Sequence, residues 1–114
     1  MTTLSQTSEL AFACELVRIL DSKRSIDYKP WMRVGLCLGR IADGKQKSEL
    51  YKEWITFSKK CPQKFDEDHC QRIFVAGPRY ELNIGSLCLW ASQDNEKLYN
   101  AIRNKYYFFS KFKN

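Results

Sequence analysis

The chain has 114 residues, and its 19 Lys and Arg outnumber its 13 Asp and Glu, which gives a formal net charge of +6. With 44% apolar and 28% charged residues, it has the composition of one soluble globular domain that can bury its own core. It has no apolar run of the roughly 20 residues that a membrane span needs and no secretion signal, so the sequence predicts an intracellular protein without membrane contact, whose positive charge favours an acidic partner.

The N-terminal third predicts two helices. Residues 1–7 are polar and are expected to be disordered, so the folded domain is expected to span residues 8–114. Thr7 or Ser8 caps a first helix that ends near Asp21, and a polar connection follows it. Asp27 caps a second helix, whose buried stripe is formed by Trp31, Val34, Leu38 and Ile41.

Two glycines in the second helix predict that another helix approaches it closely. Gly35 and Gly39 lie one turn apart, and each weakens a helix by about 1 kcal/mol relative to Ala. A neighbour that leaves no room for a side chain best explains why glycine occupies both positions.

The next two helices are predicted to form a helix–turn–helix unit with positive charge at its turn. A buried face with i, i+4 and i+7 spacing is formed by Leu50, Trp54 and Phe57. This face stops at Ser58, and three lysines follow around a Cys-Pro break: Lys59, Lys60 and Lys64. Asp66 then caps a returning helix, whose apolar side consists of Cys70, Ile73 and Phe74.

Two more helices are predicted after the break at Gly77-Pro78. Asn83 caps a fifth helix, in which Leu87 and Trp90 face inward. Gly85 and Ser86 in its first turn offer backbone N–H groups to a phosphate, although an ordinary helix start is the simpler interpretation. Asp94 caps the last helix, whose apolar stripe is Leu98, Ile102, Tyr106 and Phe109.

The C-terminal segment 106–112 is aromatic on nearly every side, which is unusual for the end of a soluble monomer. Three roles are open: it covers a groove of the bundle, it docks on another domain or chain, or its rings stack nucleobases beside Arg103, Lys105 and Lys111. The first two together are favoured. With six helical patterns, no alternating strand and short connections, the sequence predicts an all-α fold, a single compact bundle of about five or six helices.

Residues that would carry catalysis or hold a cofactor are nearly absent. The single histidine, His69, has no nucleophile in a recognisable context, and the carboxylates fall mainly at helix starts. No phosphate-binding GxxxxGK[ST] loop occurs. The five cysteines are scattered, and a site built from Cys61, His69 and Cys70 lacks a fourth zinc ligand. We therefore expect no catalytic residue, no metal and no cofactor, and a chain that is not an enzyme by itself.

Taken in order, three blocks of the sequence resemble the second type of primase C-terminal domain: DYKPWMRVGLCL, ELYKEWITFSKKCPQKFDEDHCQRIF and NIGSLCLWASQDNEKLYNAI. This is the helical module of poxvirus-related helicase–primases of large DNA viruses and of plasmid or phage primase–polymerases. The resemblance covers roughly residues 8–102. Two positions depart from the family pattern, because Phe74 stands where the family usually carries Trp and Gly39 replaces the usual His.

The resemblance implies a non-catalytic accessory domain that binds template single-stranded DNA during primer initiation, with nucleotide as a further ligand. It also implies primase–polymerase and helicase domains as partners, in the same or another chain, at sites of viral or plasmid replication in the host cytoplasm or nucleus. Core packing explains the aromatic residues that the chain shares with the family, so the candidate contacts to nucleic acid are other residues. These are Ser58, Lys59, Lys60, Lys64, Arg79, Gly85 and Ser86, and Arg103 and Lys105 are candidates of second rank. Two alternatives stay open: a docking module that joins primase and helicase without touching DNA, and a freestanding transcription regulator, for which no base-reading helix is evident.

Overall fold

The computed structural model describes residues 2–43, 48–76 and 81–112, and it describes the side chains of 9–43, 48–76 and 81–106. Seven helices occur in these ranges: α1 (Thr2–Arg18), α2 (Lys23–Ile26), α3 (Tyr28–Ile41), α4 (Glu49–Ser58), α5 (Glu67–Phe74), α6 (Ile84–Asp94) and α7 (Glu96–Phe112). The described residues contain no strand, so the predicted all-α fold is confirmed. The helix beyond the expected five or six is α2, a single turn in the connection that was expected to be irregular.

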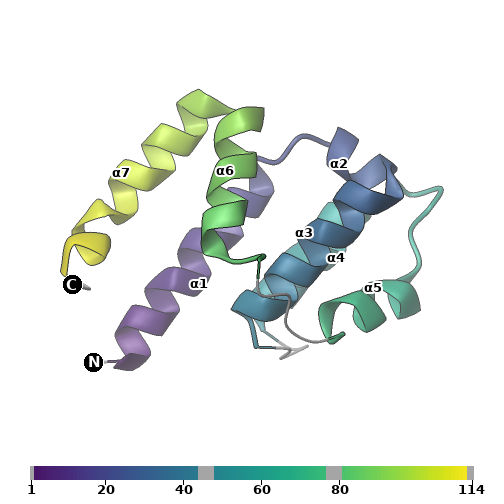
Figure 1. Ribbon diagram of the computed structural model, residues 1–114, viewed down its shortest axis with the longest axis horizontal. Coiled ribbons are helices and arrows are strands. Elements are labelled where there is room, and N and C mark those ends of the chain that lie inside the picture. The colour runs from purple at the N-terminus through teal and green to yellow at the C-terminus, as the bar shows by residue number, and fades with distance from the viewer. Residues whose placement is uncertain (1, 44–47, 77–80, 113–114) are drawn as a thin grey trace.

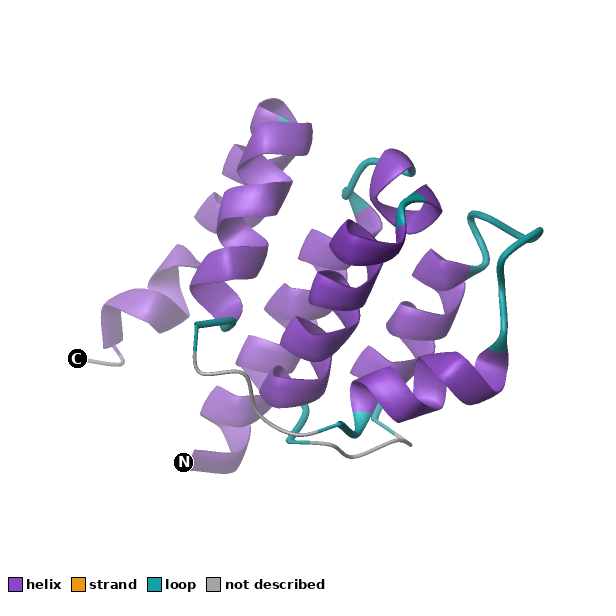
Figure 2. Cartoon of the chain, turned by 45° about the vertical axis from the view of Figure 1, so that its right-hand side comes forward, coloured by secondary structure: helices purple, strands orange, loops and turns teal. Residues whose placement is uncertain are grey.

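Helix α3 lies at the centre of the bundle and contacts helices on both sides (Figures 1 and 2). On one side it packs against α4 and α5, and on the other it packs against α6, which pairs with α7 and α1. The sequence of α3 fits this position, because six consecutive residues from Val34 to Gly39 are buried. A helix with a single apolar stripe could pack against neighbours on one side only, whereas α3 has neighbours on both sides. The largest fully buried side chains of the described residues include Trp54, Phe57, Phe74, Leu16, Leu38 and Leu50.

The predicted close approach at the two glycines of α3 is confirmed. A Cβ atom on Gly35 would lie 2.5 Å from the ring of Trp54 in α4 and 2.6 Å from the side chain of Ile73 in α5. A Cβ atom on Gly39 would lie 2.0 Å from the backbone oxygen of Phe74, at the end of α5. Glycine at these positions therefore lets α4 and α5 pack directly on the backbone of α3.

Several predicted helix ends are confirmed, and one is wrong by a single residue. Asp66 and Asn83 cap α5 and α6, and their side chains accept hydrogen bonds from backbone N–H groups of the first turn. The cap of α7 is Asn95 and not Asp94, since Asn95 Oδ1 accepts a hydrogen bond from the N–H of Leu98 at 3.2 Å. The expected inward position of Leu98 is also wrong, because this side chain is exposed.

The first helix also starts earlier than predicted. It begins at Thr2, whereas the sequence predicted a start at Thr7 or Ser8. No glycine or proline occurs between residues 2 and 18, so nothing in the chain forces the helix to begin later.

Asp94 instead joins the end of α6 to the segment after α1. Its carboxylate accepts a hydrogen bond from the backbone N–H of Asp21 at 2.8 Å and forms a salt bridge with Arg24 at 2.6 Å. Burial alone would raise the pKa of this carboxyl, but the hydrogen bonds from Arg24 and Asp21 outweigh it and hold the pKa below the ordinary value of 3.8. The Arg24 guanidinium also lies over the ring of Trp90, 5.8 Å from its centroid.

Asp94→Asn is expected to lower the free energy of unfolding at neutral pH by about 1–3 kcal/mol, because it removes hydrogen bonds to a charged acceptor. Since the folded state depresses this pKa, the contribution is fully present above the unfolded-state pKa and is lost as the pH falls through the lower folded-state pKa. Denaturant unfolding measured across acidic pH should therefore show a steeper loss of stability in the native chain than in the variant.

The matched control is Glu49→Gln, which removes a carboxylate whose ion pair with Lys52 is largely exposed. Its effect should stay within about 0.5 kcal/mol. Equal acid sensitivity of the native chain and Asp94→Asn would contradict the role assigned to Asp94.

Candidate nucleic-acid interface

The three predicted lysines of the α4–α5 turn lie on one corner of the bundle, which we call the cationic elbow (residues 58–66). The Lys60 ammonium group donates a hydrogen bond to the carbonyl oxygen of Leu20 at 3.2 Å, and the Lys64 ammonium group donates one to the carbonyl oxygen of Ile26 at 2.8 Å. The Lys59 ammonium group lies over the ring of Phe65, 5.4 Å from its centroid. The elbow is thus tied to the connection between α1 and α3.

The positive charge of the elbow is not neutralised by carboxylates. Within the described part of the chain, no carboxylate lies within ion-pair distance of Lys59, Lys60 or Lys64. The carboxylate of Asp66 instead accepts a hydrogen bond from the N–H of His69 at the start of α5. An ammonium group has three donors, so Lys60 and Lys64 keep donors available after each has bound one carbonyl oxygen. Those carbonyls hold the two ammonium groups in place.

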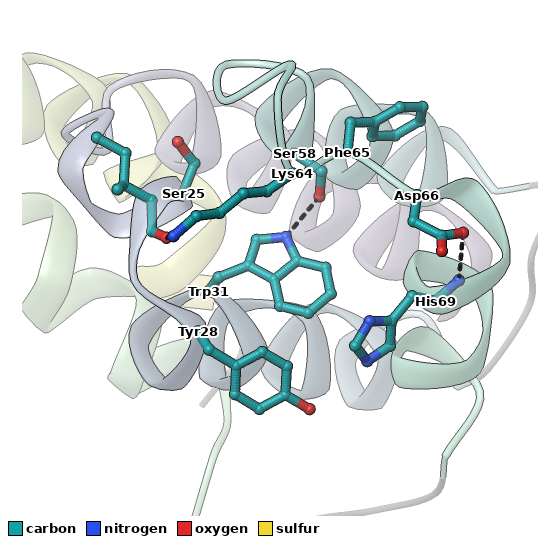
Figure 3. A pocket seen from close by; sticks show the side chains of 9 residues that line it. Ser25, Tyr28, Trp31, Ser58, Lys64, Phe65, Asp66 and His69 are labelled. Atoms are coloured by element: carbon teal, nitrogen blue, oxygen red, sulfur yellow. Dashed lines mark hydrogen bonds between the residues drawn. The ribbon is translucent and has the colours of Figure 1, made fainter.

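A pocket of about 90 Å³ opens beside the elbow, and Figure 3 shows the Trp31 indole among the side chains that line it. Tyr28 and His69 form its aromatic side: the centroid of Tyr28 lies 5.7 Å from that of Trp31, and His69 lies 5.1 Å from Trp31 in an edge-on arrangement. The remaining lining residues are Ser25, Ile26, Ser58, Lys64, Phe65 and Asp66. One wall is therefore aromatic and the opposite rim carries a lysine.

Ser58 belongs to this pocket as a residue that positions Trp31. Its side chain is buried, and its hydroxyl accepts a hydrogen bond from the Trp31 indole N–H at 2.8 Å. On its other side, Trp31 stacks on Trp54, with ring centroids 5.0 Å apart and an angle of 29° between the planes. The serine that follows the aromatic stripe of α4 thus fixes a ring of α3, and its hydroxyl is already committed to that contact.

Gly85 and Ser86, the predicted phosphate-binding residues of α6, lie away from the elbow. Their backbone N–H groups donate to Asn83 Oδ1 at 2.8 and 3.3 Å, so the amides expected to be free are already engaged in a capping box. The opposite end of α6 is the one near the elbow, because Asp94 contacts Asp21, which follows the carbonyl that Lys60 binds. The structure therefore does not bring the two predicted phosphate-binding groups together.

The second-rank cations also lie elsewhere. Lys105 forms a salt bridge with Glu15 at 2.9 Å, between α7 and α1, and Arg103 is exposed on α7. Arg79 lies outside the described residues, as do the side chains of 107–112, so the proposed roles of Arg79 and of the aromatic tail stay predictions.

Sequence reasoning assigned Trp31 to the core and did not single out Tyr28 or His69 as site residues. The only signal in the sequence was the place of Tyr28 at the start of the predicted helix, three residues before Trp31. The structure shows that Tyr28 leaves 55% of its surface exposed. His69 comes from α5, and the centroid of its ring lies 5.7 Å from that of the Tyr28 ring. Only the packing of α5 on α3 brings these rings together.

The described residues offer little for covalent or metal chemistry. Burial raises the pKa of the Cys14 thiol to about 11 and that of Cys37 to about 12, so both stay protonated and unreactive near neutral pH. Among the residues whose placement is described, no group of three His, Cys, Asp or Glu side chains is arranged to hold a metal ion. None of the described helices has the length and hydropathy that crossing a membrane requires.

The fold and the site define a small all-helical domain with a basic, aromatic-lined corner. The chain belongs to the Primase C terminal 2 (PriCT-2) family, whose model matches residues 13–91 and thereby the whole of α3, α4 and α5. This match confirms the resemblance found in the sequence.

Three curated viral proteins, each named "putative helicase", are similar to the chain. The protein of Acanthamoeba polyphaga mimivirus is 42% identical over 65 residues, which are 57% of this chain and 6% of the relative. That of Invertebrate iridescent virus 3 is 30% identical over 96 residues, 78% of this chain and 10% of the relative. That of Frog virus 3 is 34% identical over 73 residues, 64% of this chain and 7% of the relative.

The chain thus spans about a tenth or less of the length of these curated relatives. No solved structure shows a significant match to it.

Proposed function

We propose that the chain is a non-catalytic accessory domain of a viral DNA primase–helicase, and that its cationic elbow binds the phosphates of template single-stranded DNA. Membership of the primase C-terminal family and the similarity to viral proteins named as helicases support the replication role. The observation that carries the binding role is the set of three ammonium groups on one corner. Two of them are held by backbone carbonyls, and none lies within ion-pair distance of a carboxylate among the described residues.

Positive charge of this kind favours the backbone of a nucleic acid over its bases. Lysine ammonium groups neutralise phosphates and release counterions, so such binding tolerates many sequences and weakens as salt rises. The aromatic side chains next to the elbow favour a single strand, because only unpaired bases expose their faces. Two cations elsewhere on the domain, Lys105 and Arg24, are engaged with Glu15 and Asp94.

Binding of a labelled single strand should weaken with salt, and log affinity should fall with log salt concentration by about 0.7 for each phosphate that is neutralised. Lys59 gives the cleanest test, because its ammonium group contacts only the Phe65 ring among the interactions described, whereas Lys60 and Lys64 also support the fold. Lys59→Gln should reduce the steepness of this dependence by about 0.7. Fluorescence anisotropy over a series of salt concentrations provides the measurement.

The control is Lys52→Gln, the same change at an exposed lysine of α4 that pairs with Glu49. It should leave the salt dependence as it is in the native chain. Binding that does not respond to salt, or equal effects of the two substitutions, would contradict the role of the elbow.

The docking role is the second candidate, and a specific observation favours it. Leu89 on α6 and Leu98 on α7, two helices in contact, are both about half exposed and could be covered by a partner. A domain that only joins primase and helicase parts would use exposed apolar side chains such as these and would leave the elbow solvated. Such a domain would show no salt-dependent binding of single strands in the titration above.

A further inference from the structure

We propose that the pocket beside the elbow holds one unstacked nucleobase of the bound strand, which lies over Tyr28 and Trp31 while Lys64 contacts an adjacent phosphate. This inference rests on the proposed function, because it assigns to the same surface a second kind of contact with the same ligand. The pocket would contact a base of the strand, whereas the lysines of the elbow would contact only the phosphates of the strand.

The aromatic wall of the pocket is fixed before any ligand arrives. Trp31 is held at its nitrogen by Ser58, at one face by Trp54 and at an edge by His69. Tyr28 leans on the same ring at an angle of 44°. Because these rings already touch one another, a base has no room between them and would instead lie across the open side that they form together.

Exposure distinguishes Tyr28 from the other rings of this cluster. Trp54 is fully buried, whereas Tyr28 leaves 55% of its surface exposed at the first residue of α3. An aromatic face that remains in water loses the stabilisation that burial would give it. A planar, uncharged ring such as a nucleobase would cover that face without requiring a hydrogen-bond partner at a fixed place.

The polar rim of the pocket fits the remainder of a nucleotide. The side chain of Lys64 extends along the pocket to the carbonyl of Ile26, so its ammonium group lies at the edge of the aromatic wall (Figure 3). A phosphate bound there would place the attached base on the side of Trp31. This combination of an aromatic surface with a neighbouring cation is the arrangement by which proteins hold single strands without reading their sequence.

The test compares an oligothymidylate with an abasic strand of the same length, which retains the phosphates but lacks the bases. The native chain should bind the oligothymidylate about 5- to 100-fold more tightly, as expected for the stacking of one base on an aromatic side chain. Tyr28→Leu should remove most of this preference and leave the salt dependence unchanged, because the lysines remain. Tyr28→Phe, which keeps the ring, should retain the preference.

The outcomes separate this inference from the proposed function. If the native chain binds both strands equally and with the same salt dependence, the elbow binds phosphates but the pocket holds no base. If it binds neither strand at low salt, both proposals fail. If Tyr28→Leu keeps the native preference for bases, stacking occurs elsewhere and the pocket is excluded. Circular dichroism checks that the variants remain folded, which is expected since Tyr28 is exposed.

Discussion

Trp54→Ala is expected to lower the free energy of unfolding by about 3–5 kcal/mol, the range for truncation of a large buried aromatic side chain. Trp54 is fully buried, it stacks on Trp31, and its indole N–H donates to the backbone carbonyl of Cys70 at 2.9 Å. Removal of the Trp54 ring would open a cavity that adjoins α3, α4 and α5. Chemical denaturation monitored by circular dichroism measures the change.

Trp54→Phe serves as the control that separates packing from hydrogen bonding. This variant keeps an aromatic ring in the core but removes the buried hydrogen bond to Cys70, so it should cost less, about 1–3 kcal/mol. Because Trp54 supports Trp31 from below, the same variant should weaken the preference for bases over an abasic strand. Loss of less than about 1 kcal/mol in Trp54→Ala would show that the core does not depend on this ring.

Gly39→Ala is expected to destabilise the domain by about 2–3 kcal/mol, even though Ala is the better helix former by about 1 kcal/mol. The new Cβ atom would meet the backbone oxygen of Phe74 at 2.0 Å, and a backbone carbonyl at the end of a packed helix cannot rotate away. Helices α3 and α5 would have to separate. Thermal unfolding should report a decrease of about 10 °C in the midpoint.

The control for this prediction is Gly85→Ala, in the first turn of α6. There a Cβ atom would approach only the side-chain oxygen of Asn83, at 3.0 Å, so the change should stay within about 1 kcal/mol. A stabilising effect of Gly39→Ala, of the size that helix propensity alone predicts, would show that the two helices can move apart freely.

Patterns local in the sequence predicted most of the fold. The buried stripe of α4, the caps Asp66 and Asn83, and the close approach at Gly35 and Gly39 all follow from spacings of a few residues, and the structure has them. The cap of α7 was misassigned because Asp94 and Asn95 are adjacent and both are good capping residues. The choice between them depends on Arg24, which lies 70 positions earlier in the chain.

The candidate site was less predictable, for the same physical reason. The sequence shows that Lys59, Lys60 and Lys64 are close together in the chain, but not that two of them bind carbonyls about 40 positions away. Nor does it show that Tyr28 and His69, which belong to different helices, share one pocket with Trp31. Such contacts depend on how α3, α4 and α5 pack, and no local periodicity records that packing.

The absence of a side chain at Gly39 has a consequence for how the pocket, at the other end of α3, would respond to a ligand. With the end of α5 resting on the backbone of α3, these helices have little freedom to slide past one another. A nucleotide that bound across the pocket would find its surroundings already in their final shape, and little conformational entropy would be lost on binding. For the proposed template-binding role, such a preformed surface predicts that strands exchange quickly without loss of affinity.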